Sequence, residues 1–130
     1  MFLLTGFVTL LAVLAYFFTG LGVARARARF NVKAPATTGD PSFERAFRVQ
    51  QNMLEWMPMF LPSLWLFAFY LSDGWAAAIG LIWIGGRLLY ARDYAAAAEA
   101  RGRGFAIQAT ACGALFVGAA VRILWLLAHG

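Results

Sequence analysis

Residues 43–58 read FERAFRVQQNMLEWMP and carry an arginine, an asparagine and a glutamate just before an apolar run. In an α-helix, Asn52 lies about 40° from Arg48, and Glu55 lies about 20° from Arg48 on its other side, so the three side chains share one face. Ionisable groups at the mouth of a membrane segment are costly unless they pair or bind something polar. A cation and an anion together predict a site for a small zwitterionic ligand.

A second polar group follows the third apolar run. Arg87, Tyr90 and Tyr94 are spaced i, i+3 and i+7, which places them on one face of a helix. Two interpretations of Arg87 stay open. Its side chain either snorkels towards the lipid headgroups or packs between helices. Arg101 opens the sequence RGRG, which we expect to form a loop before the last helix.

The composition determines which elements must hold these side chains. The chain has 130 residues, of which 62% are hydrophobic and only 13% charged, so the bilayer must be its solvent. We predict an all-α integral membrane protein, a single four-helix transmembrane domain over residues 1–130. The expected spans are approximately residues 2–24, 42–71, 75–94 and 105–128, with the second helix starting at an Asp40 N-cap followed by Pro41.

The charge pattern predicts a topology. The basic residues cluster between spans one and two and around the connection of spans three and four, while the second loop has none. The positive-inside rule therefore places loops 1 and 3 in the cytoplasm and both termini on the opposite side, with a bacterial inner membrane as the expected location. Nucleic acid is not an expected partner, because the basic residues flank apolar spans. We interpret residues 1–24 as a retained span rather than a signal peptide.

Cysteine usage limits the chemistry further. Cys112 is the single cysteine of the chain. One thiol excludes an intrachain disulfide and any cysteine-clustered metal site, and no metal is expected. We interpret Cys112 as a small packing residue in the fourth span.

The pattern F-E-R-x-x-R-x-Q-x-N-x-x-E-x-x-P, followed about 30 residues later by R-x-x-Y-x-x-x-Y, resembles the MAPEG family. These are membrane-associated proteins in eicosanoid and glutathione metabolism, and the resemblance runs from Arg25 to Arg103. It implies a homotrimer of four-helix subunits with glutathione at the subunit interface. The glutathione contacts that it implies are Arg27, Arg48, Gln50, Asn52, Glu55, Trp56, Tyr90, Tyr94 and Arg101.

Gln50 and two departures from the family pattern bear on this site. Gln50 points about 160° away from Arg48 on the helical wheel, as a contact across a subunit interface requires. Trp56 stands where several relatives carry a tyrosine, which removes one hydroxyl from the pocket. Ala28 stands where leukotriene C synthase-like relatives carry a second arginine; either a flanking arginine, Arg27 or Arg29, substitutes for it, or the eicosanoid-type specificity is absent.

Glutathione has two carboxylates, one ammonium and a thiol. Arginines bind carboxylates through paired hydrogen bonds, Glu55 is the natural partner of the ammonium, and a guanidinium favours the reactive thiolate. Arg101 is the first candidate for thiol activation and Arg27 is the second. We expect a glutathione-dependent membrane enzyme that conjugates glutathione to lipophilic electrophiles, reduces lipid hydroperoxides, or does both.

Other interpretations stay open at this point. The basic residues near Arg27 are also typical of topology anchors that contact membrane lipids. The group of Arg48, Asn52 and Glu55 is also compatible with an internal polar cluster that holds the bundle together, and the tyrosines with an interfacial aromatic belt. The alternative functions are a non-catalytic lipid-binding scaffold of the same fold and, third, a small transporter.

Overall fold

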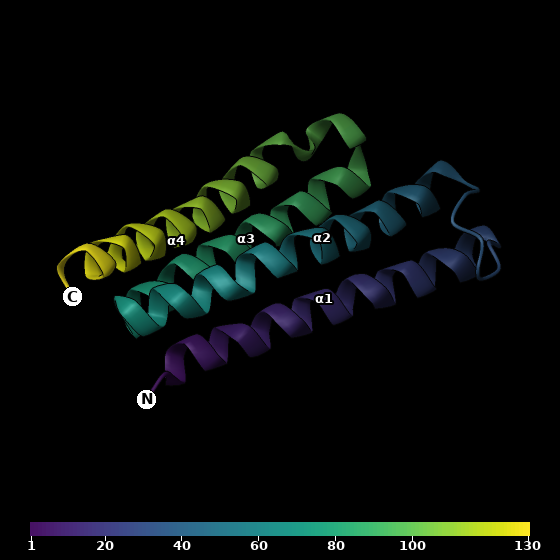
Figure 1. Cartoon of the computed structure of the whole chain (residues 1–130). Coiled ribbons are helices and arrows are strands. Elements are labelled where there is room, and N and C mark those ends of the chain that lie inside the picture. The colour runs from purple at the N-terminus through teal and green to yellow at the C-terminus, as the bar shows by residue number, and fades with distance from the viewer.

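The computed structural model describes residues 1–97 and 99–130. Over these residues the chain forms four long α-helices and one short 3₁₀ turn, with no strand (Figure 1). The elements are α1 (Leu3–Phe30), α2 (Pro41–Tyr70), α3 (Asp73–Ala96), η1 (Ala98–Arg101) and α4 (Gly102–His129). The predicted all-α fold of four helices is therefore confirmed.

The start of α2 is fixed by local hydrogen bonds, as the sequence predicted. The Asp40 carboxylate accepts a hydrogen bond from the Ser42 amide at 2.8 Å, and Pro41 occupies the first helical position. The Glu44 carboxylate accepts a hydrogen bond from the Gly39 amide at 2.9 Å. These contacts satisfy amides at the helix start, and they fix the residue at which α2 begins.

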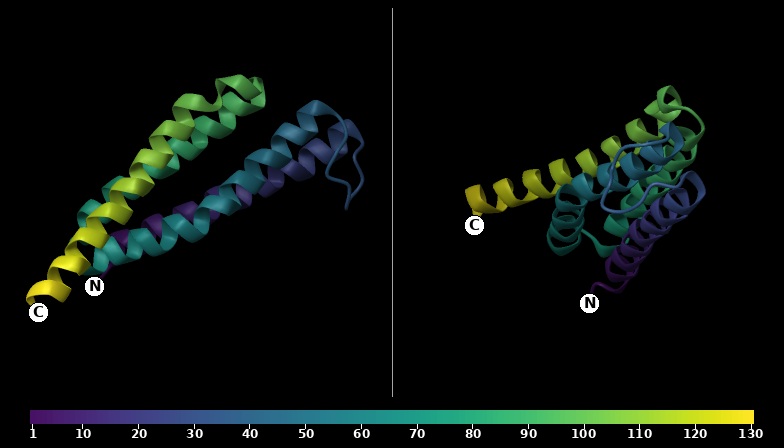
Figure 2. Two further views of the ribbon diagram at one scale, coloured as in Figure 1. Left: turned by 45° about the horizontal axis from the view of Figure 1, so that its top comes forward. Right: turned by 90° about the vertical axis from the view of Figure 1, so that its right-hand side faces the viewer.

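The helices run alternately up and down, so both termini and the α2–α3 turn lie at one end of the molecule (Figure 1). The α1–α2 connection and η1 lie at the other end, which therefore collects most of the basic residues. In the left view of Figure 2, the α1–α2 pair and the α3–α4 pair diverge towards this basic end. Its assignment to the cytoplasmic side stays a prediction.

An apolar core joins the two pairs nearer the middle of the helices. The rings of Phe60 on α2 and Trp83 on α3 stack with centroids 3.8 Å apart, and both side chains are fully buried. Leu64 of α2 and Leu115 of α4 are also fully buried in the same cluster. This packing fixes α3 and α4 against α2.

Among the described residues, three helical segments are long and apolar enough to cross a membrane: Leu3–Phe30, Asp73–Ala96 and Glu99–His129. The helix α2 is not among them, and its first half carries charged side chains, including Arg48 and Glu55. The fourth span and the predicted span boundaries therefore stay predictions.

The helices α3 and α4 approach closely where two glycines meet. A Cβ atom on Gly104 would collide with the backbone of Tyr90 and the carbonyl oxygen of Gly86, and one on Gly86 would lie 2.7 Å from the Gln108 amide nitrogen. Backbone therefore packs on backbone at this crossing. The contact brings the start of α4 beside Tyr90, which matters for the site.

Candidate functional site

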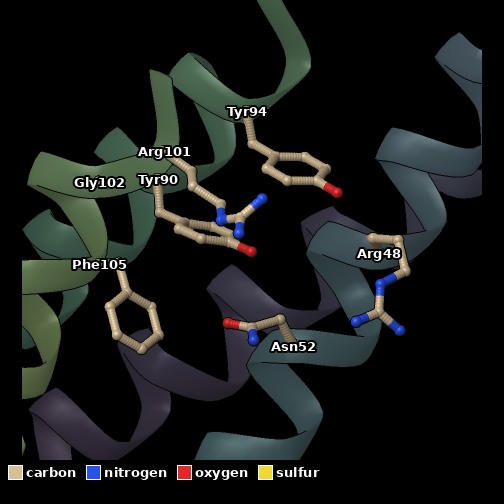
Figure 3. Close-up of a pocket in the computed structure, with 7 residues that line it drawn as sticks. All are labelled: Arg48, Asn52, Tyr90, Tyr94, Arg101, Gly102 and Phe105. Atoms are coloured by element: carbon tan, nitrogen blue, oxygen red, sulfur yellow. The ribbon is translucent and has the colours of Figure 1, made fainter. Parts of the chain in front are cut away.

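A cavity of about 340 Å³ opens at the basic end, between α2, α3 and the start of α4. Figure 3 shows its lining side chains, which come from both diverging helix pairs. The lining residues are Arg48, Asn52, Tyr90, Tyr94, Arg101, Gly102 and Phe105. Five of these were predicted as site residues, and the structure brings those five together.

The helix α2 supplies Arg48 and Asn52, one helical turn apart on the same face, as the spacing required. Arg48 is exposed, and in Figure 3 it lies across the cavity from the two tyrosines. Asn52 is partly buried below Tyr90. The exposed cation can meet a ligand that enters from the basic end.

The helix α3 and η1 supply the opposite wall. The rings of Tyr90 and Tyr94 stack with centroids 5.5 Å apart and an interplanar angle of 13°, and their hydroxyls point towards the Arg48 side of the cavity (Figure 3). The Arg101 guanidinium lies over the Tyr94 ring, with its carbon 5.7 Å from the ring centroid. Two hydroxyls and a cation therefore converge on one region, a suitable arrangement for an anionic ligand.

Arg87 lies behind this wall and was not predicted as a site residue. It is only 2% exposed, so the snorkelling interpretation is wrong and the packing interpretation fits. Its Nη1 donates to Asn52 Oδ1 at 2.7 Å, and its guanidinium carbon lies 4.6 Å from the Tyr90 ring centroid. Arg87 therefore contacts two lining residues at once. Its spacing from Tyr90 was the available signal, because it placed both on one face.

Phe105 and Gly102 are lining residues for which the sequence offered no signal. The Trp56 ring meets the Phe105 ring edge-on, with centroids 5.6 Å apart, so Trp56 lies beside the polar cavity without lining it. Trp56 instead lines an apolar cavity of about 510 Å³ between α2 and α4, together with Met59 and Phe116. The polar and apolar cavities therefore adjoin at the Trp56–Phe105 contact.

Three predicted residues lie away from the cavity within one chain. Glu55 is exposed on α2 and does not line it. Gln50 lines a separate hollow of about 370 Å³ against α1. Arg27 donates from Nη1 to the Ala36 carbonyl oxygen at 2.7 Å and lies over the Phe43 ring, so it is held at the α1–α2 connection.

This placement changes the charge balance that the helical wheel predicted. The described residues that line the cavity include the cations Arg48 and Arg101 and no carboxylate. One chain thus provides a site for the anionic groups of a ligand, and the predicted partner of an ammonium group lies outside it.

The sequence model of the MAPEG family matches residues 5–121. The chain belongs to the MAPEG family. It is 40% identical to microsomal glutathione S-transferase 2 of Homo sapiens, over 78% of this chain and 69% of that protein. It is 41% identical to leukotriene C4 synthase of Bos taurus, over 94% of this chain and 79% of that protein. An uncharacterised protein of Synechocystis is 48% identical over 92% of this chain and 88% of its own length.

Family membership and the three apolar helices support an integral membrane protein. The family and the relatives support, in general terms, a glutathione-related membrane enzyme.

Proposed function

We propose that this protein is a glutathione-dependent membrane enzyme that transfers the glutathione thiolate to a lipophilic electrophile or uses it to reduce a lipid hydroperoxide. The observation that carries the proposal is the cavity in which Arg48, Arg101 and two stacked tyrosines converge. A relative at 40% identity, microsomal glutathione S-transferase 2, is named for glutathione transfer, and this name supports the proposal.

The chemistry of the lining fits glutathione group by group. Its carboxylates suit the exposed guanidinium of Arg48 and the amide nitrogen of Asn52, since both are hydrogen-bond donors that line the cavity. Its thiol reacts as the thiolate, and a guanidinium beside the sulfur favours that form. Arg101 has this role in the proposal, because it lines the cavity and its guanidinium lies over the Tyr94 ring.

The thiolate then attacks the second substrate. In conjugation, the sulfur forms a bond to an electrophilic carbon while the leaving group departs or an epoxide opens. In hydroperoxide reduction, the sulfur takes the terminal oxygen, the lipid alcohol leaves, and a second glutathione converts the sulfenic acid to a disulfide and water. The adjoining apolar cavity of about 510 Å³ supports a lipophilic second substrate that arrives from the bilayer.

We also propose that a homotrimer is the functional unit. Glu55, Gln50 and Arg27 lie outside the cavity of their own chain, so a neighbouring copy is needed to bring any of them to a bound ligand. Large apolar side chains such as Phe7 and Phe17 of α1 and Phe116 of α4 are more than half exposed, which leaves surfaces that suit either lipid or a second copy. The family resemblance favours three copies.

The test is calorimetric titration of glutathione into the detergent-purified protein, followed by turnover with hydrophobic electrophiles and a lipid hydroperoxide. We expect binding, and we expect Arg48→Ala to weaken it about tenfold or more, because a charged hydrogen bond contributes roughly 1.5–3 kcal/mol. Lys33→Ala is the matched control, since it removes an exposed positive charge at the same end. A glutathione analogue without the thiol should bind comparably and give no turnover.

A non-catalytic scaffold is the second candidate function, and the apolar cavity alone favours it. Such a scaffold binds lipid in that cavity and has no need of glutathione. A protein that binds lipid but shows no glutathione binding in the titration would therefore establish the scaffold function and contradict the enzyme function.

A further inference from the structure

An ion pair joins the two helices that flank the turn carrying Arg101. The Asp93 carboxylate on α3 accepts a hydrogen bond from Arg103 Nε at 2.7 Å and another from Arg103 Nη2 at 3.2 Å, on separate oxygens. Asp93 is only 8% exposed, whereas the Arg103 side chain is 64% exposed. Paired hydrogen bonds of this kind fix orientation as well as distance.

Helix stability does not explain why these two charges stand where they do. Asp93 lies in the last turn of α3, where the helix dipole disfavours an anion, and Arg103 lies in the first turn of α4, where it disfavours a cation. No acidic residue occupies the first turn of α4, and no side chain caps it. Each charge is unfavourable for its own helix, so the benefit of the pair must come from the contact across the corner.

The turn η1 forms the corner between α3 and α4, where the Ala97 amide donates to the Asp93 carbonyl oxygen and the Ala100 amide donates to the Ala97 carbonyl oxygen, at 3.0 Å each. It is a four-residue 3₁₀ turn, Ala98–Arg101, and such turns have poor hydrogen-bond geometry. Arg101 is its last residue, two positions before Arg103. Asp93 directly precedes Tyr94 and lies three positions after Tyr90. The ion pair therefore links the segment carrying the guanidinium to the segment carrying both tyrosines.

We propose that the Asp93–Arg103 ion pair is a positioning device that holds the Arg101 guanidinium against the Tyr90–Tyr94 wall, an inference that rests on the proposed thiolate chemistry. Neither residue lines the cavity, so both act through Arg101. Breaking the pair lets η1 shift while Arg48 and Asn52 on α2 stay in place. Glutathione is then still held, but the cation no longer stands at its sulfur.

The test is a double-mutant cycle with Asp93→Asn, Arg103→Gln and the double variant. Each single variant should lower kcat about tenfold or more, because a displacement of about 1 Å at a reacting group can cost roughly a hundredfold. The KM for glutathione should change less than about threefold, and the ultraviolet thiolate absorbance should fall together with kcat. The double variant should lose no more than either single one, because the second change removes a partner that is already lost.

Arg92→Gln is the matched control. Arg92 also contacts Asp93, but at 3.4 Å through one nitrogen and with a side chain that is 69% exposed. This variant should stay within about twofold of wild type. Losses that multiply in the double variant, or a KM that rises as much as kcat falls, would overturn the positioning role.

Hydrogen exchange of the glutathione-free protein separates this inference from the proposed function. Asp93→Asn should speed amide exchange in residues 97–103 and leave the α2 segment around Arg48 unchanged. Unchanged exchange at the corner would overturn the inference even if the enzyme is active. A wild-type protein that binds no glutathione would instead overturn the proposed function, and the exchange experiment would still decide whether the pair holds the corner.

Discussion

Replacing Arg101 by alanine should raise the pKa of the bound glutathione thiol and leave most of the binding energy intact. The Arg101 guanidinium lies in the cavity beside the Tyr90 and Tyr94 rings. The neutral thiol gains nothing from this cation, whereas the thiolate does. The substitution therefore acts mainly on ionisation, and the carboxylates of glutathione keep Arg48.

The size of the effect follows from Coulomb's law. Two unit charges about 4 Å apart interact by roughly 4 kcal/mol at an effective dielectric constant near 20, and by roughly 1 kcal/mol in bulk water. The cavity is open at the basic end, so the interaction falls between these limits. Since one pKa unit corresponds to about 1.4 kcal/mol, loss of the guanidinium should raise the thiol pKa by roughly 1–3 units.

The assay is the ultraviolet absorbance of the thiolate, titrated against pH at saturating glutathione. A cation that lowers the thiol pKa makes the wild-type protein active from a lower pH. In Arg101→Ala, both the thiolate absorbance and the turnover rate should therefore appear only at higher pH. Both pH profiles should move up by roughly 1–3 pH units, as the thiol pKa does. Arg101→Lys keeps a cation and should retain most of the wild-type shift.

Arg27→Ala is the comparison that decides between the two candidate arginines. Arg27 is held by the Ala36 carbonyl and the Phe43 ring, so its loss should leave the thiolate signal unchanged. A wild-type signal in Arg101→Ala together with a lost signal in Arg27→Ala would show that the roles are reversed. If neither variant changes the signal, activation of the thiol comes from neither Arg101 nor Arg27.

Three further predictions concern packing, charge and assembly. Gly104→Ala should destabilise the protein by about 1–3 kcal/mol in detergent unfolding, because its Cβ would collide with the Tyr90 backbone, whereas Gly85→Ala meets nothing within 4 Å and should be neutral. Glu55→Gln should weaken glutathione binding about ten- to a hundredfold in calorimetry by removing the partner of the ammonium, and unchanged affinity would make Glu55 structural. The detergent-corrected mass should be that of a trimer, and a monomer that binds glutathione with full affinity would contradict a shared site that uses Gln50.

The parts of the fold that local chemistry determines were predictable. The apolar runs specified the helices, and Asp40 with Pro41 specified where α2 begins. Once that start was fixed, a period of 3.6 residues placed Arg48 and Asn52 on one face, and the structure has both in one cavity. Tyr90 and Tyr94 followed in the same way from their spacing on α3.

The helical wheel failed where the direction of a side chain did not determine its surroundings. Glu55 shares the face of Arg48 by angle, but it lies two turns further along α2 and is exposed there. Because Arg87 lies near the end of an apolar run, the sequence allowed its side chain to snorkel. In the structure it is buried instead, in contact with the Asn52 amide and the Tyr90 ring. Phe105 enters the site because Gly104 lets α4 approach α3, and no periodicity within α4 encodes that contact.

The Trp56–Phe105 contact has a consequence for the proposed chemistry. A polar thiol and a lipid electrophile dissolve in different phases, so a polar cavity that meets an apolar one can bring them together. The two cavities meet at this edge-on ring pair, with Arg101 and Phe105 on the polar side and Trp56 and Cys112 on the apolar side. A tyrosine in place of Trp56 would add a hydroxyl at this boundary, whereas the indole extends the apolar wall. The sequence departure at Trp56 therefore favours an apolar second substrate that approaches the sulfur along α2 and α4.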